Sequence, residues 1–242
     1  MAAVKRVAVV TGASRGLGAV VAQVLARRGY DLVIGARDEQ ALHEAAKSLQ
    51  RFGGEVVTVH GDVADPWMRS WLIYEARQLG GLDVLVNNAS ELGGIRPVAD
   101  VDLPGLERLL AVNVIAPVAL VQLGLSLLQQ RRGLVVNVSS DAARGGYSGW
   151  GGYGASKAAL DLLTRTLHGE LQDHGVAAVS VDPGDMRTRM HQEAFSGEDI
   201  SDRPLPDVTI PFWEWLFDQD GPAVSGERFA AQEEDARWLQ RV

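Results

Sequence analysis

Short apolar segments alternate with longer amphipathic segments along most of this chain. The short segments are rich in Val, Ile and Leu at consecutive positions, which is typical of strands buried on both faces of a parallel sheet. The longer segments repeat apolar residues three and four positions apart, which is the helical period. We predict strands at Arg6–Val10, Asp31–Ala36, Glu55–His60, Asp83–Asn87, Leu134–Val138 and Ala177–Val181, and helices at Gly16–Arg28, Asp38–Phe52, Asp65–Leu79, Leu103–Gln130 and Tyr153–His174.

This strand–helix alternation predicts an α/β fold with one Rossmann-like, doubly wound parallel sheet and helices on both faces. A further strand within Val224–Phe229 brings the expected number to about seven, and residues 1–242 are expected to form a single domain. Residues 187–207 do not follow the alternation of strands and helices. They form either a substrate lid over the strand ends or an ordinary surface loop. The acidic tail, residues 230–242, either covers a neighbouring subunit or the active site, or frays.

Composition narrows the function. The formal net charge of −8 argues against binding to nucleic acid or to an anionic membrane surface. The chain has no cysteine, which excludes disulfides, thiolate nucleophiles and Cys-ligated zinc. Its five histidines are scattered without ligand spacing, so no metal is expected. No apolar run reaches the ~20 residues of a membrane span, and a cytoplasmic location is the default expectation.

A glycine-rich turn follows the first predicted strand. It reads Thr-Gly-Ala-Ser-Arg-Gly-Leu-Gly, and its candidate cofactor-binding residues are Gly12, Ser14, Arg15, Gly16, Leu17 and Gly18. Glycine permits a tight turn and a close approach of backbone to a pyrophosphate, and the N-terminus of the following helix attracts the negative charge. The spacing is a variant of the usual dinucleotide-binding turn, so by itself it is a weak signal.

The end of the second predicted strand bears on the choice of cofactor. NAD-binding sites usually carry an acid there for the ribose 2′-hydroxyl. This chain has Ala36 followed by Arg37, and together with Arg15 the second arginine could pair with a 2′-phosphate. Both arginines could instead be solvated charges, and Asp38 is a competing carboxylate. We favour NADP(H) over NAD(H).

Tyr153 and Lys157 lie four residues apart in a predicted helix, and therefore on the same helical face. An ordinary tyrosine, with a pKa near ~10, is a poor acid–base catalyst at neutral pH. A fixed Lys157 cation is expected to lower the pKa of Tyr153 toward the working range. The pair would then handle the proton in chemistry between an alcohol and a carbonyl.

Several motifs together resemble the short-chain dehydrogenase/reductase family over about the first 190 residues. They are the Thr-Gly-x-x-x-Gly-x-Gly turn, Gly61-Asp62-Val63, Asn87-Asn88-Ala89, Asn113 in the long helix, Ser139-Ser140, Tyr153-x-x-x-Lys157, and Pro183-Gly184 with Thr188. Each stands at the strand or helix end where the family has it. The resemblance implies an oxidoreductase that acts on small carbonyl or alcohol substrates.

The resemblance also implies residue roles. Tyr153 is the general acid or base, Lys157 holds the nicotinamide ribose, and Asn113 holds a water of the proton relay near Lys157. The family's thirteen-residue offset to the tyrosine selects Ser140 over Ser139 as the residue that orients the carbonyl. Asp62 and Val63 would contact the adenine ring, and Asn87 would lie along the adenosine ribose. Ala89 is a further cofactor-binding candidate, and Pro183, Gly184 and Thr188 would bind the nicotinamide carboxamide. Structural alternatives are a helix bend at Asn113 and caps at Asp62 and Thr188.

Some features depart from the family or concern assembly. Ser90 replaces the usual glycine after Asn-Asn-Ala, and Trp213 and Trp215 are expected to pack a helix against the sheet. The family forms homodimers or homotetramers, and the apolar residues of the long helices (Leu106, Leu109, Leu110, Leu160, Leu163 and Leu167) are compatible with that, as with a buried face. A non-catalytic dinucleotide-binding regulator or scaffold is the alternative function, although such a protein should have lost one of Asn113, Ser140, Tyr153 or Lys157.

Overall fold

Seven parallel strands form one sheet in the computed structural model, which describes residues 5–233. The strands are β1 (Val7–Thr11), β2 (Asp31–Ala36), β3 (Val56–His60), β4 (Val84–Asn87), β5 (Leu134–Val138), β6 (Ala177–Asp182) and β7 (Arg228–Ala230). Their order across the sheet is β3-β2-β1-β4-β5-β6-β7. The α/β, doubly wound fold predicted from the sequence is confirmed. The last strand begins later than expected, because α9 and a turn occupy the start of the predicted segment.

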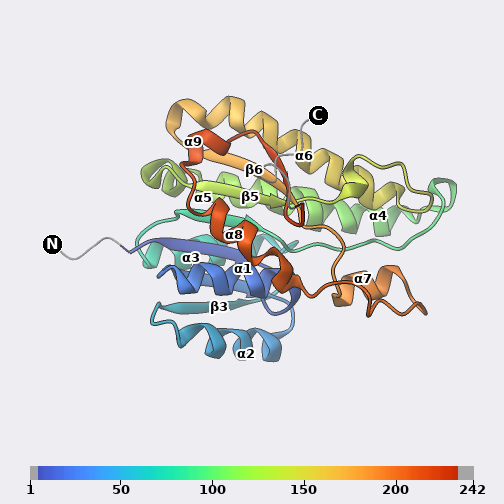
Figure 1. Ribbon diagram of the computed structural model, residues 1–242. Helices are drawn as coiled ribbons and strands as arrows, with labels where there is room; N and C mark the ends of the chain where they lie inside the picture. The colour runs from blue at the N-terminus through green and yellow to red at the C-terminus, as the bar shows by residue number, and fades with distance from the viewer. Residues whose placement is uncertain (1–4, 234–242) are drawn as a thin grey trace.

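Helices connect the strands (Figure 1). They are α1 (Gly16–Arg27), α2 (Glu39–Gln50), α3 (Pro66–Gln78), α4 (Leu103–Leu110), α5 (Ala116–Arg131), α6 (Gly151–Leu171), α7 (Arg189–Ala194), α8 (Ile210–Leu216) and α9 (Gly221–Val224). Short helical turns are η1 (Val98–Asp100), η3 (Asp141–Ala143), η4 (Gln172–His174) and η5 (Pro206–Thr209), and η2 (Ala111–Ile115) is a π turn.

Two predicted helices need correction. The segment Leu103–Gln130 is not one regular helix, since the π turn η2 separates α4 from α5. The apolar pattern continues across that turn, so periodicity alone could not reveal it. The helix predicted at Tyr153–His174 begins two residues earlier, at Gly151, and its last three residues form the tighter turn η4.

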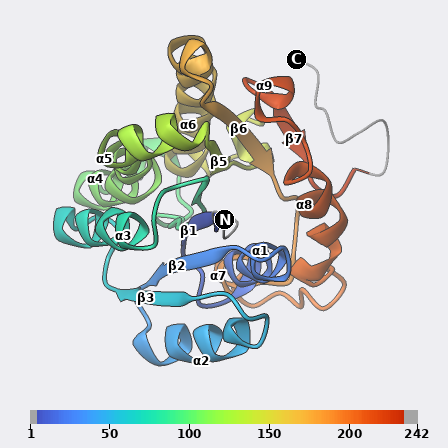
Figure 2. The ribbon, with the colours of Figure 1, turned by 90° about the vertical axis from the view of Figure 1, so that its left-hand side faces the viewer.

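Side chains that alternate along each strand build a core on each face of the sheet. Ala8 and Val10 of β1 pack with the layer of α1, α2 and α8, whereas Val7 and Val9 pack with the layer of α3 and α5. Figure 2 shows these two layers on opposite sides of the strands. Because both faces are covered, the strands are apolar at consecutive positions, which is the pattern visible in the sequence.

Aspartates fix where several helices begin. Asp38, Asp65 and Asp102 precede α2, α3 and α4, and each carboxylate accepts a hydrogen bond from a backbone amide of the first turn. A cap of this kind stabilises a helix by roughly 1 kcal/mol. Helix α1 is different, because Arg15 at its N-cap position makes no side-chain capping bond. Its first amides are therefore left for another acceptor.

Helix α8 closes the layer beside α1. Phe212 and Trp213 are fully buried there, and the Trp213 indole donates to Thr209 Oγ1 at 2.9 Å. Trp215 is partly buried against the same cluster. Both tryptophans therefore pack a helix against the sheet, as the sequence indicated.

The segment Leu103–Arg131, which holds α4, η2 and α5, is long and apolar enough to cross a membrane by length and composition. It packs along the sheet through residues such as Leu120 and Leu128, which are fully buried. Core helices of soluble proteins pass the same test. The expectation that the protein has no membrane partner stays a prediction.

Candidate active site at the carboxyl ends of the strands

A cavity of about 810 Å³ lies at the carboxyl ends of the strands. From β1, the strands β2 and β3 follow on one side of the sheet, whereas β4 to β7 follow on the other side. Where the strand order reverses in this way, a crevice opens at the carboxyl ends of the strands, and ligands bind there. Many predicted cofactor residues line this cavity: Gly12, Ser14, Arg15, Gly16, Leu17, Gly18, Arg37, Asp62, Val63, Ala89, Tyr153, Lys157, Pro183 and Thr188. Asn87, Asn113, Ser140 and Gly184 do not line it.

The glycine-rich turn is shaped for close approach of a ligand to backbone. Gly12 has a φ of +66°, a left-handed conformation that side chains disfavour. A Cβ on Gly18 would lie only 2.3 Å from the Gly12 carbonyl oxygen, so a larger residue cannot replace Gly18 without moving the turn. The uncapped N-terminus of α1 opens at the same place. These residues fit the pyrophosphate of a dinucleotide.

Both candidate phosphate-binding arginines lie in the cavity and both have carboxylate partners. Arg15 pairs with Asp38, and Arg37 pairs with Glu91 through its Nη1 and the Glu91 Oε1 at 2.5 Å. The Asp38 carboxylate also accepts from the Ala41 amide at 3.0 Å. This backbone bond and the bond from Arg15 lower the pKa of Asp38. The competing carboxylate thus serves as the cap of α2 as well as the partner of Arg15.

Through Glu91, the ion pair of Arg37 continues along the cavity wall to Arg108 and Asp62. Arg108 Nη2 donates to Asp62 Oδ2 at 2.6 Å and to Glu91 Oε1 at 2.7 Å. Burial raises the pKa of Asp62, but hydrogen bonds from Arg108 and from the Ala64 amide outweigh it and leave the pKa lowered. Asp62 accepts from the Ala64 amide at 2.9 Å in the turn before α3, but Asp65 is the cap of that helix, so the capping role weighed for Asp62 is not found. Asp62 lines the cavity. Glu91 and Arg108 were not identified from the sequence.

The structure corrects the placement of Asn87. Its side chain is 3% exposed and donates to Asn137 Oδ1 at 2.8 Å, across the β4–β5 pair. It therefore points into the protein rather than toward the cofactor cavity. Asn88, the next residue, instead donates to the carbonyls of Thr11 and Gly12 at 2.9 and 3.2 Å and fixes the glycine-rich turn against β4.

Tyr153 and Lys157 share one face of α6, as their spacing predicted. Lys157 Nζ lies 5.6 Å from the centre of the Tyr153 ring and donates to the Val138 carbonyl at 2.7 Å. Lys157 is 2% exposed, and burial lowers its pKa to about 8 even though Asp161 and Asp182 act in the opposite direction.

The prediction that Lys157 lowers the pKa of Tyr153 is wrong for the protein without a cofactor. Burial raises the pKa of Tyr153 to about 12, against hydrogen bonding from Ser140 and Ser90, which lowers it. The phenol is mostly desolvated, and its charged form loses more hydration than the neighbouring groups replace. Tyr153 is therefore held in its protonated, proton-donating form near neutral pH.

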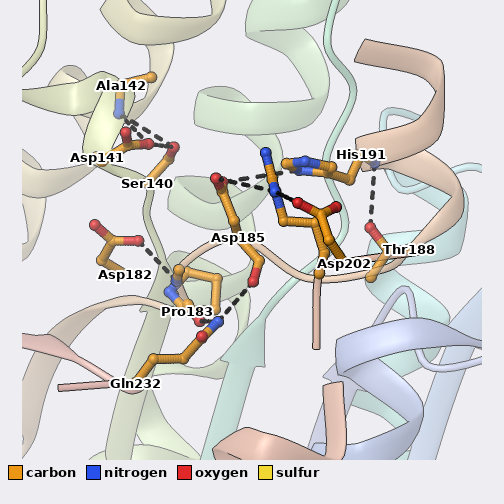
Figure 3. Close-up of polar contacts among 12 residues, drawn as sticks. Ser140, Asp141, Ala142, Asp182, Pro183, Asp185, Thr188, His191, Asp202 and Gln232 are labelled. Atoms are coloured by element: carbon orange, nitrogen blue, oxygen red, sulfur yellow. Dashed lines mark hydrogen bonds and ion pairs between the residues drawn. The ribbon is translucent and has the colours of Figure 1, made fainter. Parts of the chain in front are cut away.

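Ser140 stands next to Tyr153 in this environment, and its hydroxyl already has a partner. Its Oγ donates to Asp141 Oδ1 at 2.9 Å, and the Tyr147 hydroxyl donates to Asp141 Oδ2 at 2.8 Å. Figure 3 shows Ser140 turned toward Asp141 and Ala142 at the start of η3. Ser139 is buried at the cavity wall, and its hydroxyl has no hydrogen-bond partner among the described residues, so the choice of Ser140 over Ser139 stays a prediction.

Asn113 lies in the π turn η2, a type of turn that occurs frequently at functional sites. Its side chain is 1% exposed and accepts from the Glu91 amide at 2.9 Å and from Ser90 Oγ at 3.2 Å. Its Nδ2 donates to the Glu91 carbonyl at 2.9 Å and to Ser156 Oγ at 3.0 Å. The side chain therefore holds the loop after β4 in place, from a π turn within the long helical segment.

The segment after β6 covers the cavity. Thr188 Oγ1 accepts from the His191 amide at 3.2 Å and caps α7, which was the structural alternative for this threonine, and Thr188 also lines the cavity. Gln232 donates to the carbonyls of Pro183 and Asp185 at 2.9 and 2.8 Å (Figure 3). Residues of the candidate lid 187–207 therefore border the cavity, whereas most of the predicted tail, 230–242, lies outside the described residues.

His191 lies in α7, in the same segment. It stacks on Phe195 with ring centres 4.7 Å apart, and its Nδ1 is 3.8 Å from Asp185 Oδ1. Phe195 is 6.1 Å from the Trp150 ring, which itself contacts Tyr153 edge-on at 5.8 Å. An aromatic wall thus leads from α7 to Tyr153.

Arg228 of β7 connects this last strand to the residues around the candidate site. It donates to Asp161 Oδ2 at 3.0 Å, to Asp182 Oδ2 at 3.1 Å and to the Ser140 carbonyl at 2.8 Å. All three charged side chains are at most 8% exposed. Arg228 therefore neutralises two buried carboxylates near Lys157 and holds the backbone of Ser140. A lone arginine in a short strand gave no signal of this in the sequence.

The fold and cavity define a dinucleotide-binding α/β protein with a tyrosine–lysine pair at the site. A model of the short chain dehydrogenase family matches residues 6–199, and the chain belongs to this family. An uncharacterized oxidoreductase of Saccharomyces cerevisiae is 36% identical over 188 residues, which cover 76% of this chain and 72% of that one. An uncharacterized oxidoreductase of Escherichia coli is 29% identical over 236 residues, with 94% and 92% covered.

Solved structures agree with this assignment. A short chain dehydrogenase from Pseudomonas syringae superposes with a TM-score of 0.88 at 30% identity and covers 95% of this chain and 96% of its own. A short chain dehydrogenase from Escherichia coli, complexed with NADPH, gives a TM-score of 0.87 at 30% identity, with 94% and 97% covered. The resemblance seen in the sequence is confirmed, and the protein is an oxidoreductase of this family.

Proposed function

We propose that this protein is an NADP(H)-dependent oxidoreductase that interconverts a ketone or aldehyde with the corresponding alcohol, with Tyr153 as the acid or base. The observation that carries this proposal is a single cavity lined by the uncapped start of α1, by Arg15 and Arg37, and by Tyr153 and Lys157. Groups suited to a phosphorylated dinucleotide and groups suited to proton transfer share one space.

The residues of the cavity divide the work of holding the cofactor. The first backbone amides of α1 would hold the pyrophosphate of the cofactor. Arg15 and Arg37 would bind its 2′-phosphate. Asp62 and Val63 would border the adenine. By resemblance to the family, Lys157 would hold the nicotinamide ribose, and Pro183, Gly184 and Thr188 the carboxamide. The Escherichia coli relative complexed with NADPH supports the choice of the phosphorylated cofactor.

When bound, the reduced cofactor supplies a hydride to the carbonyl carbon, and the protein handles the proton. Tyr153 donates its proton to the carbonyl oxygen, for which a pKa of about 12 keeps it ready at neutral pH. Ser140, next to Tyr153, would orient the same oxygen. Lys157 holds a positive charge beside the tyrosinate that results, at least below its own pKa of about 8. By resemblance to the family, Asn113 would hold a water of the proton relay near Lys157.

The expected location is the cytoplasm, and this stays a prediction. A regulator or scaffold that binds a dinucleotide without chemistry remains the alternative outcome of the following experiment.

Fluorescence titration with NADPH and NADH, followed by turnover on a panel of ketones and aldehydes, tests the proposal. We expect tighter binding of NADPH and reduction of at least one substrate. Tyr153→Phe should lower kcat by at least about 100-fold, since general acid catalysis contributes that much, while NADPH affinity stays nearly unchanged. Tight NADPH binding without turnover on any substrate would favour the regulator, and equal turnover by Tyr153→Phe would remove the mechanism.

A further inference from the structure

Arg37 and Glu91 form an ion pair across the end of β1. Arg37 follows β2 and Glu91 lies in the loop after β4, and these two strands flank β1 in the sheet. Both residues line the cavity at the carboxyl ends of the strands, where Arg37 Nη1 donates to Glu91 Oε1. The ion pair therefore bridges two walls of the space that a dinucleotide would enter.

Glu91 is the anchored member of this pair. Asn113 bonds both the backbone amide and the carbonyl of Glu91, each at 2.9 Å. The Glu91 carboxylate also accepts two hydrogen bonds from Arg108, from Nε to Oε2 at 3.1 Å and from Nη2 to Oε1 at 2.7 Å. Its side chain is only 20% exposed. The charge of Glu91 therefore stays compensated by Arg108 when Arg37 leaves.

Arg37 is the member of the pair that is free to leave. Its side chain is 62% exposed, and among residues 5–233 its guanidinium has no hydrogen-bond partner besides Glu91. Exposed ion pairs are weak, because water competes for both charges. A phosphate carries about two negative charges at neutral pH and accepts two parallel bonds from one guanidinium. It is therefore a stronger partner for Arg37 than a carboxylate that Arg108 already shares.

We propose that Glu91 is a specificity-determining residue, which holds Arg37 in the cofactor-free protein and releases it to the 2′-phosphate of NADP(H). Arg37 exchanges one anion for another, while Glu91 keeps its bonds to Arg108. Molecules in which Glu91 occupies Arg37 bind the phosphate less well, so Glu91 lowers the apparent affinity for the phosphorylated cofactor. NADH has no group that needs Arg37, and its affinity should depend on Glu91 far less. This inference rests on the proposed function, in which Arg37 binds the 2′-phosphate.

Equilibrium binding tests the inference, because it needs no turnover. Fluorescence titration gives Kd for NADPH and NADH, and calorimetry gives Kd for adenosine 2′,5′-bisphosphate and 5′-AMP, which differ by the 2′-phosphate alone. In Glu91→Gln we expect NADPH and the bisphosphate to bind about three- to fivefold tighter, which is the range for loss of an exposed ion pair. NADH and 5′-AMP should change by less than about twofold.

Two controls separate the ion pair from a general change of charge. In an Arg37→Met background, Glu91→Gln should change Kd for the bisphosphate by less than about twofold, because no arginine is left to release. Asp207→Asn removes the same charge from the wall of the same cavity, and within the described part of the chain the Asp207 carboxylate bonds no arginine. It should leave the ratio of the NADPH and NADH affinities unchanged. Thermal midpoints show whether each variant is folded.

A crystal structure of the wild type with adenosine 2′,5′-bisphosphate is a second measurement, and it needs no variant. We expect Arg37 to contact the 2′-phosphate and Glu91 to stay bonded to Arg108. An Arg37 that still bonds Glu91 in this complex overturns the inference. So does a gain in affinity by Glu91→Gln that is as large in the Arg37→Met background as in the wild type, since Arg108 or the net charge would then be its cause.

Failure of this inference and failure of the proposed function give different results. A protein that binds NADPH no tighter than NADH, both as wild type and as Glu91→Gln, overturns the choice of NADP(H) and the role of Glu91 with it. A preference for NADPH that is equal in the wild type and in Glu91→Gln overturns the inference alone. A loss of NADH affinity in Glu91→Gln also overturns it, because Glu91 would then accept from the ribose hydroxyls. A gain for NADPH that requires Arg37 establishes the role.

Discussion

At the scale of the residue, burial shifts the pKa values of Tyr153 and Lys157, the proposed catalytic pair, in opposite directions. Burial penalises charge, so it raises the pKa of the acidic Tyr153 and lowers that of the basic Lys157. The expected pair of lysinium and easily formed tyrosinate is therefore not the resting state of the cofactor-free protein. Near neutral pH both groups hold their protons, which suits reduction of a carbonyl better than oxidation of an alcohol.

This leads to a prediction about the pH dependence of NADPH use. The value of kcat/KM for NADPH reports groups of the cofactor-free enzyme. Lys157 has a pKa of about 8, so its charge is present below that pH and is lost above it. We expect kcat/KM for NADPH to be flat from pH 6 to about 7.5 and to fall about tenfold per unit above pH ~8. Tyr153, with a pKa of about 12, adds no limb in this range.

Steady-state kinetics between about pH 6 and 10, in buffers of constant ionic strength, measures this profile. Lys157→Met, which cannot titrate, should show a low value and no limb near pH ~8. A wild-type profile that stays flat to pH ~10 would show that Lys157 keeps its charge despite its burial.

At the scale of the element, β7 carries a residue that joins three parts of the site. Arg228 bonds Asp161 of α6, Asp182 of β6 and the Ser140 carbonyl after β5. Removal of one partner from a buried ion network leaves uncompensated charge, which costs about 3–5 kcal/mol. We therefore expect Arg228→Met to lower the free energy of unfolding by about that amount, measured by urea denaturation. Arg165→Met, at an exposed position of α6, should change it by less than about 0.5 kcal/mol.

A loss below about 1 kcal/mol in Arg228→Met would mean that the two carboxylates are hydrated or protonated once the arginine is gone. Protonation is a realistic competitor for Asp182, whose pKa burial already raises even with Arg228 beside it. Repeating the denaturation at lower pH separates these cases, because a protonated Asp182 no longer needs a cation.

At the scale of the whole molecule, those parts of the fold could be predicted whose sequence pattern lies within a few consecutive residues. Strands buried on both faces and the glycine-rich turn are visible within a few residues, and so is the Tyr153–Lys157 spacing. The Arg108–Asp62 and Arg228–Ser140 contacts span 46 and 88 residues, so no short pattern contains them. The inward direction of Asn87 was also missed, because it depends on which face its strand gives to Asn137.

The long helical segment leads to the last prediction, which concerns assembly. In the apolar window of Leu103–Arg131, with a mean hydropathy of 2.0, only 44% of the residues are buried within one chain. Ile115 and Leu123 there, and Leu162 on α6, are 55%, 42% and 57% exposed. Leu109 and Leu160, which the sequence offered as candidates for subunit contacts, are core residues instead. Exposed apolar side chains are stabilised when a second copy of the chain packs against them. We therefore expect a homodimer or homotetramer.

Sedimentation velocity should therefore give a mass of two or four times 26.0 kDa. Leu123→Glu should shift the protein toward the monomer, because a buried carboxylate without a partner opposes association. Val208→Glu is a matched control, since Val208 is 44% exposed but belongs to η5, in the segment before α8 on the other side of the sheet. A protein that is monomeric at every concentration would contradict the predicted homo-oligomer, and the apolar surface would then contact a different partner. If its solubility also depended on detergent, that partner would be a membrane.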